Sequence, residues 1–544
     1  MPKTTAWRAV LFGLALAAAL ILVRNADSLL GHSWSPLLTE KGKAFKLLLV
    51  AGCFSLLLYG LHTYYRPFLS NPRLPRYAVL LCLFGACVTI LFLLPPFQGP
   101  DEIVHWKFAL AYYRRDGVKD PAYSLPEQLK AYDLPFQGDQ HQDAALLRQP
   151  LQSGLAPSLP EDYGYVRWYS YPLVAAVALL YPRSATMGEA LQFYYVCRAI
   201  PMVILLLLLL WANRRFLVPY TALIFFSLPI FLQQCCVVST DNLLNLGTLA
   251  ATLLFLHLWR KPNLPLTVLL WLLCLLMTLS KYIVGGVLLF PLLLLPFRRI
   301  PRKKLVVPAG LLAAAGIMLF LIPHVLDSLR ATHGHYGSEQ IEAQIARLTT
   351  WRGLRSFVHM YLSMLKKLWG IDCWSCYMGW LDTSLSSLHL VLIRISFIVA
   401  LLLDLCHFGP WLRRIWVEHR REALLVAGLI GANLFVNTCG VALAYFIIGV
   451  EPGGLAIHHW QVRHFFSGLT VLVLLPVLLG DCGRGLTPIS GSLEIGCLSP
   501  SGPSTEGCQS SLPPILCAVA LGVLPLLLFA RNLELAIDLL IRYW

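Results

Sequence analysis

Apolar runs about as long as a membrane is thick recur along almost the whole chain, and this feature restricts the possible folds most strongly. A helix needs about 20 mainly apolar residues to cross the hydrocarbon core of a bilayer. Only 13% of the residues are charged, whereas a soluble domain has about 25%. We therefore expect an all-α, polytopic integral membrane protein.

The apolar runs predict a transmembrane helical bundle of about thirteen spans. These lie at 7–23, 45–61, 77–94, 194–211, 216–232, 243–258, 264–279, 283–297, 305–322, 388–405, 423–448, 465–479 and 512–529. The first run lacks a cleavage site followed by a polar segment, which favours a retained helix over a signal peptide. We divide the chain into an amino-terminal transmembrane hairpin (1–76), a transmembrane core (77–480), and a flexible cytoplasmic loop with a last span (481–544).

The formal net charge of +15 fits a membrane protein better than a nucleic-acid-binding one. Lys and Arg gather in cytoplasmic loops of membrane proteins, and short basic clusters such as Arg214–Arg215 fall on one side if the amino terminus is cytoplasmic. No nucleic acid partner is expected. Two large loops, 95–193 and 323–387, then lie outside the cytoplasm. The short apolar piece 171–180 predicts a helix lying at the membrane interface.

Three polar residues follow the Pro95–Pro96 stop of the span at 77–94: Asp101, Glu102 and His105. Because helices end at or before such prolines, the carboxylates are expected just outside the membrane surface. His105 would lie one helical turn away on the same face. Such carboxylates can deprotonate an acceptor hydroxyl or bind a divalent metal. The alternative is that Asp101 or Glu102 only caps the following helix.

Other candidate substrate-binding residues fall on the same predicted side. Lys281 lies between two apolar runs, where a cation suggests a phosphate partner. Capping is the alternative for Asp241 and its neighbours, and snorkelling is the alternative for Arg198. The full set comprises Arg198, Asp241, Asn245, Lys281, Trp380, Asp382, Gln461, Arg463 and His464. Separately, Cys373 and Cys376 suggest a disulfide if their compartment is oxidising, whereas a structural zinc site would need two further ligands.

Five motifs in order resemble a bacterial family of membrane proteins named domain of unknown function 2142. They are Pro100-Asp-Glu-Ile-Val-His105, Ser239-Thr-Asp241-Asn, Ser280-Lys281-Tyr, Gly379-Trp-Leu-Asp-Thr383 and Gln461-Val-Arg-His-Phe465. The last departs from the family pattern, with Val462 and His464 in place of Gly and Tyr. The resemblance covers roughly residues 77–479.

That family is similar to the GT-C glycosyltransferases, which use polyprenyl-phosphate-linked sugars. The resemblance implies a GT-C type bundle whose catalytic core is 77–480, with short interfacial helices in its two external loops. It also implies that Asp101 is a base or metal ligand, that Glu102 supports it, and that Lys281 and Arg463 bind the carrier phosphate. No metal is inferred; Mg²⁺ or Mn²⁺ would take Asp101 and Glu102 as ligands.

We therefore expect an inverting glycosyltransferase in the bacterial inner (cytoplasmic) membrane, with its active site on the extracytoplasmic face. Its partners would be the lipid-linked donor, membrane lipids, and a glycan, lipid or protein acceptor. One alternative is a transporter or flippase of a lipid-linked saccharide, which would use the same charges as a translocation path. Another is a non-enzymatic scaffold of an envelope assembly complex. The sequence specifies neither the sugar nor the acceptor.

Overall fold

The computed structural model shows a helical fold for the parts of the chain that it describes. These are residues 73–94, 96–97, 99, 102–113, 125, 170–180, 187–261, 263–281, 343, 346–368, 377–378, 383–418, 420–449, 465–477 and 514–543. Its helices are α4 (Leu74–Leu93), α5 (Glu102–Tyr113), α8 (Pro172–Leu180), α9 (Met187–Arg215), α10 (Tyr220–Phe226), α11 (Pro229–Cys236), α12 (Thr240–Arg260), α13 (Leu264–Ser280), α18 (Trp351–Leu368), α19 (Ser387–Glu418), α20 (Arg420–Gly449), α21 (Phe466–Val473) and α23 (Pro514–Tyr543).

Six of the described helices are long and apolar enough to cross a membrane: α4, α9, α12, α19, α20 and α23. Each overlaps a predicted span, and α13 coincides with the predicted span 264–279. The expectation of an all-α membrane bundle is therefore confirmed in outline. The predicted spans 7–23, 45–61, 283–297 and 305–322 lie outside the described residues. The total of about thirteen spans stays a prediction.

The prediction of one continuous span at 216–232 was wrong, because α10 and α11 are separate short helices. Leu228 is extended, with φ −61° and ψ 134°, and Pro229 begins α11. A residue before proline avoids the helical conformation, which explains the break. Arg531 of α23 donates a hydrogen bond to the hydroxyl of Ser227 at 2.9 Å. A distant helix thus supplies a polar contact at the break.

The predicted external loops contain more helix than the hydropathy indicated. The expected interfacial helix at 171–180 is confirmed as a helix, α8. The amphipathic helix α18 was not predicted individually, because its basic residues lower the average hydropathy of the segment. Strands β1 (Tyr377–Met378) and β2 (Thr383–Ser384) pair antiparallel, with Tyr377 opposite Ser384. This short ladder is the only strand pairing in the described parts of the chain.

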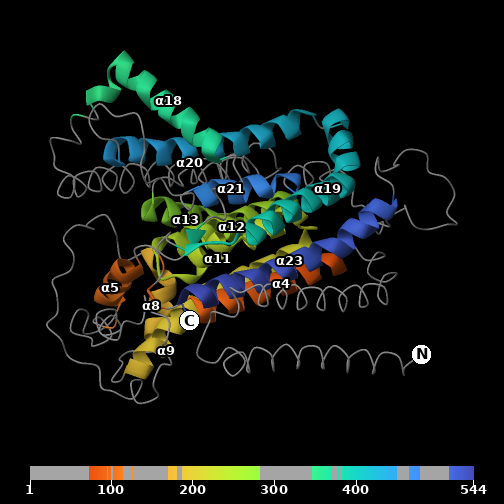
Figure 1. The fold of residues 1–544 in the computed structure, drawn as a ribbon. Helices are drawn as coiled ribbons and strands as arrows, with labels where there is room; N and C mark the ends of the chain where they lie inside the picture. The colour runs from red at the N-terminus through yellow and green to blue at the C-terminus, as the bar shows by residue number, and fades with distance from the viewer. Residues whose placement is uncertain are drawn as a thin grey trace, which may run out of the picture. The chain divides into compact units, whose positions relative to one another are not determined.

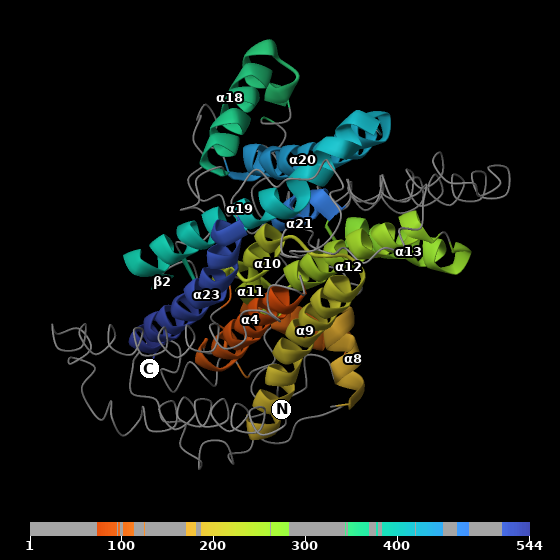
Figure 2. The same ribbon diagram turned by 90° about the vertical axis from the view of Figure 1, so that its right-hand side faces the viewer.

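Two apolar clusters hold the described helices together. The larger one includes residues of α4, α10, α11, α12, α19 and α21, and α23 packs along both α4 and α19 (Figures 1 and 2). The smaller one joins α5 and α8 to the first turns of α9 around Trp106 and Tyr194, which are both fully buried. The smaller cluster positions the segment between α4 and α5.

Helix α4 defines two ends of the bundle. Arg76 lies in its first turn, and Leu94 follows its last residue. These positions are separated by about 27 Å along the helix axis, close to the thickness of a hydrocarbon core. We call them the Arg76 end and the Glu102 end. Helix α12 begins and α13 ends at the Glu102 end, because residues there contact Glu102 or one another. Arg198, in the first half of α9, contacts Leu94 at the same end.

Candidate functional site

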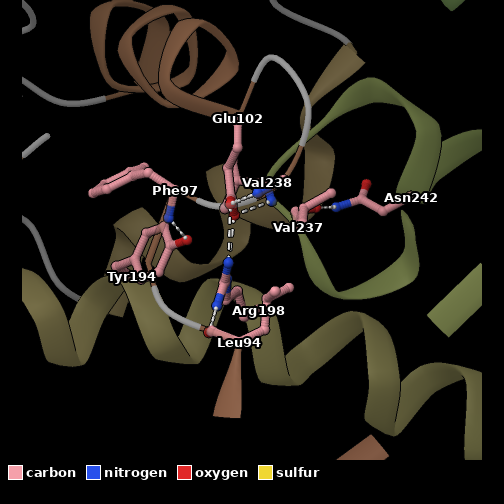
Figure 3. A network of polar contacts seen from close by, with 9 residues as sticks. Leu94, Phe97, Glu102, Tyr194, Arg198, Val237, Val238 and Asn242 are labelled. Atoms are coloured by element: carbon pink, nitrogen blue, oxygen red, sulfur yellow. Dashed lines mark hydrogen bonds and ion pairs between the residues drawn. The ribbon is translucent and has the colours of Figure 1, made fainter. Parts of the chain in front are cut away.

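A fully buried ion pair between Glu102 and Arg198 forms the centre of the candidate site (Figure 3). Both side chains are 0% exposed, and Nη2 of Arg198 lies 2.9 Å from Oε2 of Glu102. The guanidinium Nε also donates to Oε1 at 3.2 Å. Two backbone amides, those of Gly99 and Val238, donate to the same carboxylate at 3.1 and 3.0 Å. A buried charge pair is tolerated only when the remaining lone pairs are satisfied in this way.

Arg198 also holds the carboxyl end of α4. Its Nη1 donates to the carbonyl of Leu94 at 2.7 Å, and its guanidinium lies 4.8 Å from the ring centre of Tyr194. The hydroxyl of Tyr194 accepts from the amide of Phe97 at 2.8 Å. Phe97 has a φ of 63°, which is unusual for a bulky residue. These contacts hold Leu94 in place and keep Phe97 in a backbone conformation that its side chain does not favour.

Gly99 permits the segment between α4 and α5 to lie against the turn before α12. A β-carbon at this position would lie 2.3 Å from Cγ1 of Val237 and 3.1 Å from Oε2 of Glu102. Such distances are shorter than van der Waals contact, so only glycine fits here without movement. The close approach brings the amide of Val238 within reach of Glu102.

A second charge pair lies just beyond that turn. Nζ of Lys281, which follows α13, lies 2.8 Å from Oδ1 of Asp241 in the first turn of α12. Unlike the first pair it is accessible, because the side chains of Lys281 and Asp241 are 26% and 9% exposed. Ser239 caps α12 by accepting from the amide of Asp241. Val237 accepts from the side chain of Asn242. The turn 237–242 therefore contacts Glu102 and also carries Asp241.

Asn245 lies one turn further along α12 from Asp241 and is 2% exposed. Its Nδ2 has no hydrogen-bond partner among the described residues. An unsatisfied buried donor costs about 1–3 kcal/mol, which makes it a candidate for contact with a ligand. His105, a predicted catalytic residue, is only half-buried. Its Nδ1 lies 2.5 Å from the hydroxyl of Tyr171, at the start of α8.

Six predicted site residues lie outside the described part of the chain: Asp101, Trp380, Asp382, Gln461, Arg463 and His464. Cys373 and Cys376 also lie outside it. Within the described residues, no group of three or more His, Cys, Asp or Glu side chains suits a metal ion. The predicted roles of these residues therefore stay predictions.

Glu102 and Arg198 form an ion pair with each other, which the sequence did not predict. Arg198 does not snorkel, because its side chain is buried. Sequence reasoning also missed Tyr194, Gly99 and Val238, which fix the same segment. The glycine between Pro-rich stretches was the one signal of a close backbone approach.

The fold and this site define the class: a helical membrane protein with two interhelical charge pairs at one end of its bundle. The family model described as predicted membrane protein, domain of unknown function 2142 (DUF2142), matches residues 82–439. This match covers more than half of the sequence, so the chain belongs to that family. No curated protein and no solved structure matches the chain.

Proposed function

We propose that the protein is a membrane glycosyltransferase of GT-C type, which takes its sugar from a polyprenyl-phosphate-linked donor. The acceptor would be an envelope glycan, lipid or protein at the extracytoplasmic face of the bacterial inner membrane. The observation that carries the proposal is the accessible Lys281–Asp241 pair at the Glu102 end. A partly exposed ammonium at the membrane boundary suits the phosphate of a donor whose lipid tail stays in the bilayer.

The contacts of described residues near Asp101 in the sequence support this proposal, because they hold Leu94, Phe97 and Glu102 in place. Arg198 holds Leu94 and Glu102, and Tyr194 holds Phe97. A reacting carboxylate must be held close to its working position for efficient catalysis. Asp101 directly precedes Glu102 in the sequence, so we propose it as the base. Glu102 is then a positioning residue, because its own charge is neutralised by Arg198.

In the proposed reaction, Asp101 takes the proton of the acceptor hydroxyl, and the hydroxyl oxygen bonds to the anomeric carbon. The bond between that carbon and the phosphate oxygen breaks, and the electron pair leaves with polyprenyl phosphate. Attack from the opposite side inverts the anomeric configuration. Lys281 and Arg463 would stabilise the negative charge on the leaving phosphate. No metal is required by this scheme.

The first test is transfer of radiolabelled sugar from polyprenyl-phosphate donors to a membrane glycolipid extract by the purified protein. The Asp101→Asn variant should lose transfer, while Glu189→Gln should keep it, because Glu189 is an exposed carboxylate in the first turn of α9. If neither the wild type nor Asp101→Asn transfers sugar but both bind the donor equally, the catalytic proposal fails and the transporter alternative gains support.

A second test separates donor binding by Lys281 from a purely structural role. The variants Lys281→Gln, Asp241→Asn and their double form a cycle. If Lys281 binds the phosphate, the KM for the donor rises by about 10–100-fold in Lys281→Gln and stays high in the double variant. A return to the wild-type KM in the double variant would show that the KM depends on charge balance between Asp241 and Lys281, and not on phosphate binding by Lys281.

A further inference from the structure

Helix α18 presents three different faces, and two of them have no use in the site described above. The helix contains no acidic residue and five Arg, Lys or His residues in the segment WRGLRSFVHMYLSMLKKL. With 3.6 residues per turn, its side chains divide into a protein-facing side, an exposed apolar side and a basic side.

The protein-facing side packs against the second half of α20. Tyr361 hydrogen-bonds Thr438 at 2.9 Å, and the ring of Phe357 meets that of Phe446 at 5.7 Å between centroids. Met360 and Met364, one turn apart, are buried on the same side. Higher residue numbers in α18 meet lower ones in α20 at this contact, and Figures 1 and 2 show α18 crossing α20 at an angle. α20 begins just after α19, whose Asp404 binds α10 at the Arg76 end, so α18 approaches the Glu102 end.

The exposed apolar side consists of Trp351, Leu354, Val358 and Leu362, at spacings of three and four residues. Their exposed fractions are 80%, 42%, 45% and 58%. A soluble surface would not sustain such a stripe, whereas acyl chains would cover it. Trp351, at the start of the stripe, is the residue type enriched at the boundary between acyl chains and headgroups.

The basic side lies next to the apolar one. Arg352, Arg355, His359 and Lys366 project from it, and all four are exposed. Successive members are three, four and seven residues apart, so they follow one face of the helix. Figures 1 and 2 show α18 at the margin of the described helices, touching α20. A row of cations beside an apolar stripe matches the anionic headgroups and acyl chains of a bilayer surface.

We propose that α18 is a headgroup-binding helix, which seats its apolar side among acyl chains and binds anionic phospholipid headgroups with its basic side. The occupant is bulk anionic lipid, of which phosphatidylglycerol is the probe. This inference stands independently of the proposed transferase activity, because it rests on contacts and exposure of α18 alone. It would fix how α18 and the following β1–β2 ladder sit against the membrane surface.

Site-specific crosslinking tests the proposal in the full-length protein. Leu362→benzoylphenylalanine is placed in nanodiscs containing phosphatidylethanolamine with phosphatidylglycerol as the minor lipid and a trace of polyprenyl phosphate. Mass spectrometry identifies the captured lipids. Leu207→benzoylphenylalanine is the matched control, because Leu207 is 59% exposed within a run of leucines in α9, where we expect acyl chains and no headgroups. We expect phosphatidylglycerol to be enriched at position 362 and to match its bulk share at position 207.

Neutralisation of the basic side then shows whether the cations cause the enrichment. Arg352→Gln, Arg355→Gln and Lys366→Gln together should reduce it by at least about fivefold, the effect of one surface cation. Arg352→Lys with Arg355→Lys keeps the charge and should keep the enrichment, which controls for misfolding. Equal capture at both positions, insensitivity to neutralisation, or preferential capture of polyprenyl phosphate would each overturn the proposal.

Discussion

At the Arg76 end of the bundle, buried charges bind backbone groups at the start of a neighbouring helix, whereas at the Glu102 end charges also pair across helices. Asp404 accepts from the amides of Tyr220 and Thr221 at 2.7 and 2.8 Å and so caps α10. Arg76 donates to the carbonyl of Val218 at 2.6 Å and lies over the ring of Tyr220. These charges stabilise the start of one helix.

At the Glu102 end, each charge pair joins residues far apart in the sequence. Glu102 and Arg198 come from α5 and α9, and Asp241 and Lys281 from α12 and the end of α13. One pair is fully buried, whereas the other is partly exposed through Lys281. The contrast is therefore between charges that cap one helix at the Arg76 end and charges that join distant helices at the Glu102 end.

The strongest test of this difference between the two ends is to remove one charge of the buried Glu102–Arg198 pair. Arg198→Gln should cost about 3–5 kcal/mol of stability, because it leaves the Glu102 carboxylate buried without a counter-charge. The double variant Glu102→Gln/Arg198→Gln should be more stable than this single variant, since it removes both charges and keeps an acceptor oxygen for one of the two backbone amides. Denaturation in detergent, followed by circular dichroism, measures both. Additive losses would show that the pair is not coupled.

A smaller effect is expected when the segment is pushed away from α11 and α12. Gly99→Ala should cost about 1–3 kcal/mol, because the new β-carbon overlaps Val237. Gly428→Ala in α20 is the matched control: a β-carbon there meets nothing within 4 Å, and alanine favours a helix by about 0.5–1 kcal/mol. Thermal unfolding of the two variants should shift in opposite directions. A stable Gly99→Ala variant would contradict the close packing.

Loss of charge at the Arg76 end should affect stability alone. Asp404→Asn keeps one acceptor oxygen but weakens the cap of α10, at a cost of about 1–2 kcal/mol. The KM for the donor should not change, because Asp404 and the accessible pair lie at opposite ends of the bundle. A raised KM in a correctly folded Asp404→Asn variant would remove the functional distinction between the two ends.

The smallest stability change is expected at the accessible pair. Lys281→Gln should alter the free energy of unfolding by less than about 1 kcal/mol, since partly exposed ion pairs contribute little. Its effect on donor binding, proposed above, would therefore be large relative to its effect on stability. Asp404→Asn should show the reverse pattern, which makes the two variants a matched comparison when both are measured on one preparation. A large destabilisation by Lys281→Gln would show that the Asp241–Lys281 pair stabilises the fold, as the Glu102–Arg198 pair does.

Much of the fold could be predicted from the sequence because transmembrane helices satisfy their own backbone. The ranges of α4, α12, α13 and α20 lie within a few residues of the predicted spans. The break between α10 and α11 was not predicted, because averaged hydropathy does not reveal a single extended residue. Pro229 was the local signal of this break. Helix α18 was missed because its apolar and basic faces cancel in the average.

The site was less predictable, because its geometry depends on long-range pairing. The sequence placed Glu102, Arg198, Asp241 and Lys281 on one side, and the structure brings them to one end. It could not reveal that Glu102 is matched to Arg198, a residue 96 positions away. Nor could it show that Asp241 pairs with Lys281 while Ser239 caps α12. Partner choice between distant charges is set by packing, which a single sequence does not display.

The hydrogen bond from Arg531 to Ser227 can form only late in biogenesis, after most of the chain has been synthesised. The two residues are 304 positions apart. At about 5–20 residues per second, a ribosome needs about 15–60 s to add that length. During this interval the break between α10 and α11 is in or near the membrane without its arginine, and α4 and α19 lack the helix that packs along both. The nascent protein therefore remains incompletely packed during this interval. Insertion factors can bind it in that state, and proteolysis competes with completion of the fold.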